Sequence, residues 1–249
     1  MTLKEKMLGG LSMVKVSVIT TLYNYSDYIE DCIKSFLDQN FDDSEMIIVD
    51  DASDDDPYSI IKKYESDRVR YIRLDKNKGY SNAKNVGIKA CNSEILVMLD
   101  ADDMLTPGSL KVRYKRMMKK DYDFVHGPCL DMKEGRSLVR NRLWDLWNKK
   151  GGWKNVHAQG VMLKKDIHRR IGLYDDTLWC KSDREFFARV FNHDFKIGTV
   201  KEDVAFYRRH KKQMHRSKEK LKINEKLQKE VMKKIKVRKK DLSGLEMLS

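Results

Sequence analysis

Two acidic segments of this 249-residue chain could bind a metal ion and a charged ligand. Asp100-Ala101-Asp102-Asp103 directly follows the apolar run Ile95–Leu99, and Asp50-Asp51 directly follows Met46–Val49. A carboxylate at the end of a buried strand has a fixed position, and two carboxylates two residues apart can share one divalent cation. Mg²⁺ or Mn²⁺ prefers one or two carboxylates together with water and phosphate oxygens. The spacing therefore favours a metal site at the first segment that would also hold a diphosphate.

Other uses of these acids stay open. Helix capping is the alternative for the first segment, and it suits Asp103 better than Asp100 or Asp102, which come too early to cap a helix beginning near Pro107. In the second segment, one carboxylate could accept hydrogen bonds from a base or a ribose. The three acids at positions 54–56 are expected to be solvated turn and capping residues.

Apolar patterns define the elements that must position these acids. Short apolar or β-branched runs predict strands at 14–20, 46–49, 69–74, 95–99 and 160–163, whereas 124–128 belongs to a less regular second half. Helical patterns predict helices at 28–37, 57–64 and 81–90, from 106 onward, and near Asp166 and Asp183. Asp56 is the expected N-cap of the second helix, with Pro57 in its first turn. This alternation indicates a mostly parallel sheet flanked by helices, with ligands beyond the carboxyl ends of its strands.

Composition excludes several classes of protein. With 41% hydrophobic and 36% charged residues, 3 Pro and 13 Gly, the chain is neither collagen-like nor wholly disordered. No Gly-x-Gly-x-x-Gly or Gly-x-x-x-x-Gly-Lys-[Ser/Thr] segment follows a strand, which disfavours dinucleotide oxidoreductases and P-loop enzymes. The 4 Cys are scattered without a Cys-x-x-Cys pair, so reduced thiols are expected. The longest aliphatic run is too short to span a bilayer, and residues 1–10 show no secretory signal, so a cytoplasmic location is expected.

The net charge of +13 lies in one segment. Between Tyr207 and Lys240 there are 16 Lys and Arg against 3 Asp and Glu, and the rest of the chain is balanced. A four-residue repeat predicts a basic amphipathic helix there, with an apolar stripe formed by Ile223, Leu227, Val231 and Ile235. Such a helix could contact the inner face of an anionic membrane or a polyanion, or it could pack by its stripe on the main domain.

Several motifs, in sequence order, resemble glycosyltransferase family 2, which has the GT-A fold. Residues 16–25 resemble its opening strand and loop, 47–53 its Val-Asp-Asp-x-Ser segment, and 77–87 its Asn-x-Gly…Ala-Arg-Asn-x-Gly stretch. Residues 99–103 are similar to its Asp-x-Asp metal motif, 160–175 to its acceptor-side segment, and 181–189 to its Glu-Asp-x-x-x-x-x-Arg helix. Tyr207-Arg208-Arg209-His210 resembles its closing Tyr-Arg-x-His loop. The resemblance covers about Lys15 to His215.

The resemblance implies transfer, with inversion, of a sugar from a nucleotide diphosphate sugar, by default a UDP sugar, to an acceptor hydroxyl. It implies a set of donor-binding residues: Thr20, Tyr23, Asp51, Lys84 and Asp100. Lys84 stands where the family often has Arg, so it keeps the charge but lacks the planar fork. Asp102 matches the principal metal ligand, Asp100 supports ribose and metal, and Mn²⁺ or Mg²⁺ is the implied cofactor. His210 could complete the metal site or lie in a surface segment without a chemical role, and Arg208 or Arg209 could neutralise phosphate.

Asp183 matches the catalytic base of the family, although Ser182 replaces the usual Glu and Glu185 is a rival candidate. Ser182-x-x-Glu185 is a capping-box pattern, in which Ser182 caps the helix and Glu185 binds back to the Ser182 N–H. This pattern would occupy Glu185 and leave Asp183 free, so Asp183 is the predicted base. Four aromatic side chains could contact a sugar or pack in the fold: Trp144, Trp147, Trp153 and His157.

We therefore expect a nucleotide-sugar-binding half at residues 13–103, an acceptor-binding half of the same domain at 104–215, and a basic helical tail at 216–249. The predicted function is that of a metal-dependent glycosyltransferase acting on a glycan, a lipid-linked glycan or an anionic polymer. Two other functions stay open, namely a noncatalytic module that binds a polyanion or a sugar nucleotide, and a metal-dependent phosphohydrolase. Residues 207–240 are the predicted contact with a membrane or polyanion.

Overall fold

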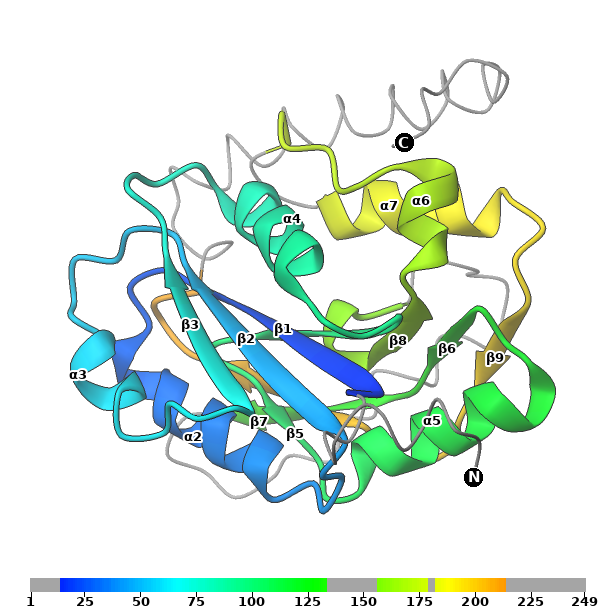
Figure 1. The fold of residues 1–249 in the computed structure, drawn as a ribbon, viewed down its shortest axis with the longest axis horizontal. Helices are drawn as coiled ribbons and strands as arrows, with labels where there is room; N and C mark the ends of the chain where they lie inside the picture. The colour runs from blue at the N-terminus through cyan, green and yellow to red at the C-terminus, as the bar shows by residue number, and fades with distance from the viewer. Residues whose placement is uncertain (1–13, 134–155, 179–181, 214–249) are drawn as a thin grey trace, which may run out of the picture.

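A computed structural model describes residues 14–133, 156–178 and 182–213, and its main feature is a seven-stranded sheet in the order β3-β2-β1-β4-β8-β6-β9 (Figure 1). Four strands of this sheet are parallel: β1 (Val16–Leu22), β2 (Ser44–Asp50), β3 (Val69–Arg73) and β4 (Ile95–Asp100). β8 (Val161–Lys164) is antiparallel to both of its neighbours, and β6 (Phe124–His126) is parallel to β9 (Ile197–Thr199). The predicted mostly parallel α/β sheet is confirmed.

Helices cover both faces of this sheet. α2 (Ser26–Leu37) and α5 (Ser109–Lys120) lie on one face, and α4 (Tyr80–Ala90), α6 (Asp166–Ile171) and α7 (Ser182–Phe191) lie on the other (Figure 1). Successive residues of a strand point to opposite faces, so Val18 packs in the core beneath α2 and α5, whereas Ile19 packs in the core beneath α4 and α7. Because both faces are covered, every residue of β1 is buried, instead of every second one.

A second, three-stranded sheet adjoins the loop after β4. In it β10 (Ala205–Arg209) pairs with β5 (Met104–Leu105) in antiparallel fashion and with β7 (Cys129–Lys133) in parallel. The pairing carries the chain around residue 208 against the acidic loop, where Arg208 N–H donates to Asp103 Oδ1 at 2.8 Å. The small sheet therefore places the closing segment of the described chain beside the carboxylates that follow β4.

Two predicted helices differ from the structure, one in its length and cap and the other in its start. The helix expected at 57–64 is a single turn, α3 (Tyr58–Ile61), and Asp56 does not cap it, because its backbone is left-handed with a φ of 47°. α5 begins at Ser109, because Gly108 before it has a φ of 73°, outside the helical region. The other strands and helices expected in the described ranges start and end within one or two residues of their predicted limits, apart from the unpredicted short strands that complete the sheets.

Some expectations concern residues that the structure does not describe. The predicted tail helix at 216–249, His215 and the three tryptophans Trp144, Trp147 and Trp153 lie outside the described residues. Within the described ranges, no helix combines the length and apolarity needed to cross a membrane. Cys32, Cys91 and Cys129 are buried free thiols, as expected, and Cys180 lies outside the described residues.

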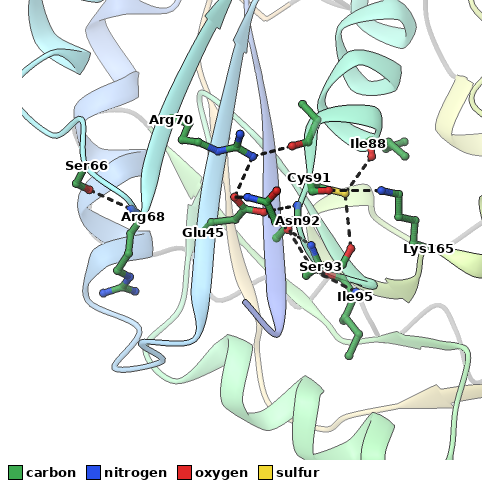
Figure 2. A network of polar contacts seen from close by, with 12 residues as sticks. Glu45, Ser66, Arg68, Arg70, Ile88, Cys91, Asn92, Ser93, Ile95 and Lys165 are labelled. Carbon is green, nitrogen blue, oxygen red and sulfur yellow. Dashed lines mark hydrogen bonds and ion pairs between the residues drawn. The ribbon is translucent and has the colours of Figure 1, made fainter. Parts of the chain in front are cut away.

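A buried carboxylate joins several segments at the amino end of the sheet (Figure 2). Glu45 on β2 is 1% exposed and accepts hydrogen bonds from Ser17 Oγ at 2.6 Å and from Arg70 Nη2 at 2.9 Å. It also accepts from the backbone and side-chain nitrogens of Asn92, at 2.7 and 2.9 Å. These partners lie on β1, β3 and the turn before β4. Glu45 thus has a structural role at the amino end of the sheet, whereas the acidic segments lie at the carboxyl ends of β2 and β4.

We predict that Glu45→Gln lowers the free energy of unfolding by about 2 kcal/mol, because the amide nitrogen cannot accept the bonds that the carboxylate receives from its neighbours. Urea denaturation at neutral pH measures the change. The matched control is Glu94→Gln, since Glu94 is paired with Arg169 but its side chain is 67% exposed. We expect that variant to lose less than about 1 kcal/mol; equal losses in the two variants would contradict the role given to Glu45.

Candidate active site

Three carboxylates meet where β4 ends. Asp100, Asp102 and Asp103 each offer an oxygen, and these oxygens lie within 4.8 Å of one another. Burial raises the pKa of Asp103 well above its usual range, and the charges of Asp102 and Asp100 add to this effect. Asp103 Oδ2 is also buried without a hydrogen-bond partner among the described residues. A cation bound among these oxygens would relieve their repulsion, so the all-oxygen donor set fits Mg²⁺ or Mn²⁺.

Asp100 is held from two sides. Its Oδ1 accepts a hydrogen bond from Tyr80 OH at 2.7 Å, and its Oδ2 accepts one from Gln159 Nε2 at 2.8 Å. Tyr80 begins α4, whereas Gln159 lies in the 3₁₀ turn η3 (Ala158–Gly160), which directly precedes β8. Burial raises the pKa of Asp100, and the nearby Lys84 charge opposes that rise. The carboxylate therefore joins the first half of the chain to the second.

A buried arginine fixes the turn that carries Gln159. Arg113 on α5 is 0% exposed and donates to Val161 O at 3.1 Å and to Ser109 Oγ at 2.7 Å. Its partners are all neutral oxygens, and burial lowers its pKa to about 10. The guanidinium thus satisfies carbonyl groups at the start of β8 that would otherwise be buried without donors. Neither Arg113 nor Gln159 stood out in the sequence, because neither belongs to a motif.

His210 lies beside the three carboxylates. Its Nε2 is 2.9 Å from Asp102 Oδ2, its ring is packed 4.4 Å from that of Tyr28, and its Nδ1 has no partner among the described residues. The preceding Arg208 donates from Nε to Asp102 O at 2.9 Å and from Nη2 to Asp31 at 2.8 Å. His210 therefore contacts one predicted metal ligand, Asp102. The cluster of potential metal ligands itself consists of Asp100, Asp102 and Asp103. Asp103, for which capping was the alternative, accepts the Arg208 amide and not a helix N–H.

The carboxylates of the second acidic segment accept hydrogen bonds from other groups of the protein. Asp51 is 3% exposed, and its carboxylate accepts the N–H groups of Lys78 and Gly79 at 2.8 and 2.7 Å. Asp50 accepts bonds from Tyr71 OH and Arg73 Nη1, both at 2.6 Å. Burial raises the pKa of Asp51, and the two backbone hydrogen bonds oppose that rise. Asp51 thus shapes the loop that leads into α4.

The other predicted donor-binding residues differ in accessibility. Tyr23 is 42% exposed at the end of β1, whereas Thr20 is fully buried and its Oγ1 has no hydrogen-bond partner among the described residues. Lys84 is also buried, with its Nζ 3.9 Å from the centroid of the Tyr80 ring and 5.1 Å from that of Tyr174. Burial lowers the pKa of Lys84, and the charges of Asp100 and Asp183 oppose this. The ammonium group therefore lies close to both carboxylates.

Asp183 and Glu185 have different environments on α7. Ser182 is the first helical residue and its Oγ is buried without a partner among the described residues, so the predicted serine cap is wrong. Glu185 is 0% exposed and accepts bonds from Arg189 Nε and Nη2, both at 3.0 Å. This ion pair occupies Glu185, though by a different contact from the one predicted. Asp183 is half-buried, and its charge also raises the pKa of Tyr80, behind the effects of burial and Asp100.

Comparisons with known proteins identify one family. The family model described as Glycosyl transferase family 2 matches residues 17–165. The glycosyltransferase GlyG of Streptococcus pneumoniae is 24% identical over 214 residues, which cover 78% of this chain and 70% of that protein. A GalNAc(5)-diNAcBac-PP-undecaprenol beta-1,3-glucosyltransferase of Campylobacter jejuni is 36% identical over 180 residues, 71% of this chain and 51% of that protein. The crystal structure of S. aureus TarS 1-349 matches with a TM-score of 0.72 at 20% identity, over 90% of this chain and 64% of that one.

The chain belongs to glycosyl transferase family 2 and is a glycosyltransferase with the GT-A fold. The predicted family, fold class and enzyme class are confirmed. The chain spans about half of the Campylobacter protein and 64% of the TarS chain.

We predict that Asp102→Asn weakens the binding of Mn²⁺ at least tenfold, because a neutral amide replaces one of three converging carboxylates. Titration calorimetry of the purified protein with MnCl₂ alone measures the change. The control is Asp54→Asn, which removes an exposed carboxylate from the other acidic segment. Equal Mn²⁺ affinity in Asp102→Asn and the unaltered protein would show that the cation does not bind at this cluster.

Proposed function

We propose that this enzyme is a metal-dependent, inverting glycosyltransferase that moves a sugar from a nucleotide diphosphate sugar, in first place a UDP sugar, to an acceptor hydroxyl. The observation that carries the proposal is the meeting of three carboxylates beyond β4, with Asp183 close enough for its charge to act on the same Tyr80 and Lys84. The TarS fold neighbours support the donor class, since their structures include complexes with UDP and with UDP-GlcNAc.

In the proposed reaction Asp183 is the general base. It takes the proton from the acceptor hydroxyl, whose oxygen attacks the anomeric carbon on the face opposite the diphosphate, so that the configuration inverts. General-base assistance contributes roughly 10²–10⁴ in rate. A divalent cation held by Asp100 and Asp102 would supply Lewis-acid stabilisation of the charge on the leaving diphosphate. Asp102 also keeps His210 in place, and Gln159 and Tyr80 fix the orientation of Asp100.

Donor binding is assigned to the residues at the carboxyl ends of β1 and β2. Tyr23 offers an exposed ring to a base, and Thr20 offers a hydroxyl without a protein partner among the described residues. Asp51 acts by ordering the loop before α4, and Lys84 supplies positive charge beneath the diphosphate. In this proposal residues 13–103 form the donor half and 104–215 the acceptor half of one domain.

The proposed acceptor is a glycan, a lipid-linked glycan or an anionic polymer. The Campylobacter relative supports the lipid-linked class, because its name specifies a PP-undecaprenol-linked glycan. A cytoplasmic enzyme with a peripheral contact at the membrane, through residues 207–240, would fit such an acceptor because the segment carries 16 basic and 3 acidic residues. A thermal-shift screen of nucleotides and nucleotide sugars, with and without Mn²⁺, tests the donor assignment. If no sugar nucleotide raises the melting temperature in the presence of Mn²⁺, the proposal fails.

We predict that Asp183→Asn retains donor binding but lowers transfer at least 10²-fold, because the amide cannot accept the acceptor proton. Glu185→Gln is the paired variant, and we expect it to lower the melting temperature by weakening the buried bond to Arg189 while folded protein still transfers sugar. Transfer assays normalised to folded protein, with calorimetry of donor binding, separate the two effects. Transfer abolished in Glu185→Gln and retained in Asp183→Asn would reverse the assignment.

A further inference from the structure

β10 and the residue that follows it present two different sets of side chains. Arg208 and His210 contact the acidic loop and α2, through Asp102, Asp31 and Tyr28. Successive strand residues point to opposite faces, so Tyr207 and Arg209 lie on the other face of the small sheet. The proposed metal and donor chemistry uses only the first set. Tyr207 and Arg209 have no role in that chemistry.

The second set forms a compact polar cluster with β7. Arg209 makes a two-bond contact with Asp131, from Nε to Oδ1 at 3.0 Å and from Nη2 to Oδ2 at 3.2 Å. The guanidinium lies 4.8 Å from the centroid of the Tyr207 ring, and that ring lies 6.0 Å from the ring of His157. The Asp131 and Arg209 side chains are 15% and 28% exposed, so the pair is only partly covered.

This cluster lies next to the proposed reaction centre. Tyr207 directly precedes Arg208, whose N–H binds Asp103, and His157 lies two residues before Gln159, which binds Asp100. Burial lowers the pKa of His157, while the charges of Asp183 and Asp131 raise it, so the imidazole is close to both carboxylates. The cluster therefore adjoins the acidic loop through Tyr207 and the turn that binds Asp100 through His157.

The ion pair has a hydrogen-bonding capacity that fits a sugar diol. Within the described residues, Arg209 Nη1 has no acceptor, and each Asp131 oxygen accepts one hydrogen bond from Arg209 and has a lone pair left. Donor and acceptor groups therefore lie side by side. A hydroxyl group both donates and accepts, so two neighbouring hydroxyls of a sugar ring can bind the carboxylate and the guanidinium together.

We propose that Asp131 and Arg209 bind neighbouring hydroxyl groups of an uncharged sugar ring in the acceptor. The inference rests on the proposed function and narrows its acceptor to a molecule that ends in a neutral sugar.

An anionic group is the less suitable occupant. The Arg209 charge is already balanced by Asp131 through two bonds, so a phosphate or carboxylate would meet the Asp131 charge at close range. Removing the Asp131 charge should therefore change the preference of the cluster from a neutral sugar to an anion.

The test is saturation-transfer NMR on the full chain with UDP and Mn²⁺ present. The neutral probes are the methyl glycosides of glucose, galactose and N-acetylglucosamine, and the anionic probe is sn-glycerol 3-phosphate. We expect at least one glycoside to bind the unaltered protein, and its affinity to fall at least fivefold in Asp131→Asn and in Arg209→Lys, which keeps the charge but loses the planar fork. Glycerol phosphate should bind Asp131→Asn more tightly than the unaltered protein.

Glu94→Gln is the matched control, because Glu94 also makes a two-bond contact with an arginine, Arg169, but lies at the amino end of β4. It should leave every probe unchanged. The inference is overturned if no glycoside binds, if glycoside binding is equal in Asp131→Asn and the unaltered protein, or if the unaltered protein prefers glycerol phosphate through Arg209. Calorimetry with UDP on the same samples separates the two proposals, since absent UDP binding would overturn the proposed function itself.

Discussion

Mutual repulsion among Asp100, Asp102 and Asp103 is the constraint on which the site depends. Burial and proximity raise the pKa values of Asp100 and Asp103, so the group is unfavourable when fully charged and without a counter-ion. The surrounding chain compensates with hydrogen bonds from Tyr80, Gln159 and Arg208. These donors come from α4, from the turn before β8 and from β10, so the carboxylates draw distant segments together. The same repulsion makes the group suitable for a divalent cation.

The ion pair on α7 shows how local structure can separate two carboxylates that the sequence places two residues apart. Glu185 forms an ion pair with Arg189, which also donates to the carbonyl oxygens of Gly172 and Leu173. That arginine holds the segment between α6 and α7 by several bonds at once. Asp183 has no ion pair among the described contacts. It is half-buried, and its charge acts on Lys84. The difference in partners, and not the residue type, distinguishes the two acids.

The sequence predicted features that depend on local pattern. The parallel core, the acids at strand ends and the position of Asp183 in a first helical turn follow from apolar runs and motif order. The structure adds contacts between distant residues, such as that of Gln159 with Asp100, 59 positions apart, and that of Arg209 with Asp131, 78 positions apart. No periodicity encodes such pairs. The capping patterns at Asp56 and Ser182 were wrong because a left-handed backbone at the first and an earlier helix start at the second removed the expected geometry.

The alternating faces of β10 also bear on how this enzyme can diversify. Inserting or deleting one residue in the strand would exchange its two faces, turning Arg209 toward the carboxylates and the His210 ring away from Asp102. One such event would disturb both the proposed metal site and the proposed acceptor contact. Homologues that evolve toward new acceptors are therefore expected to keep the length of this strand and to vary by point substitution on the face that carries Tyr207 and Arg209.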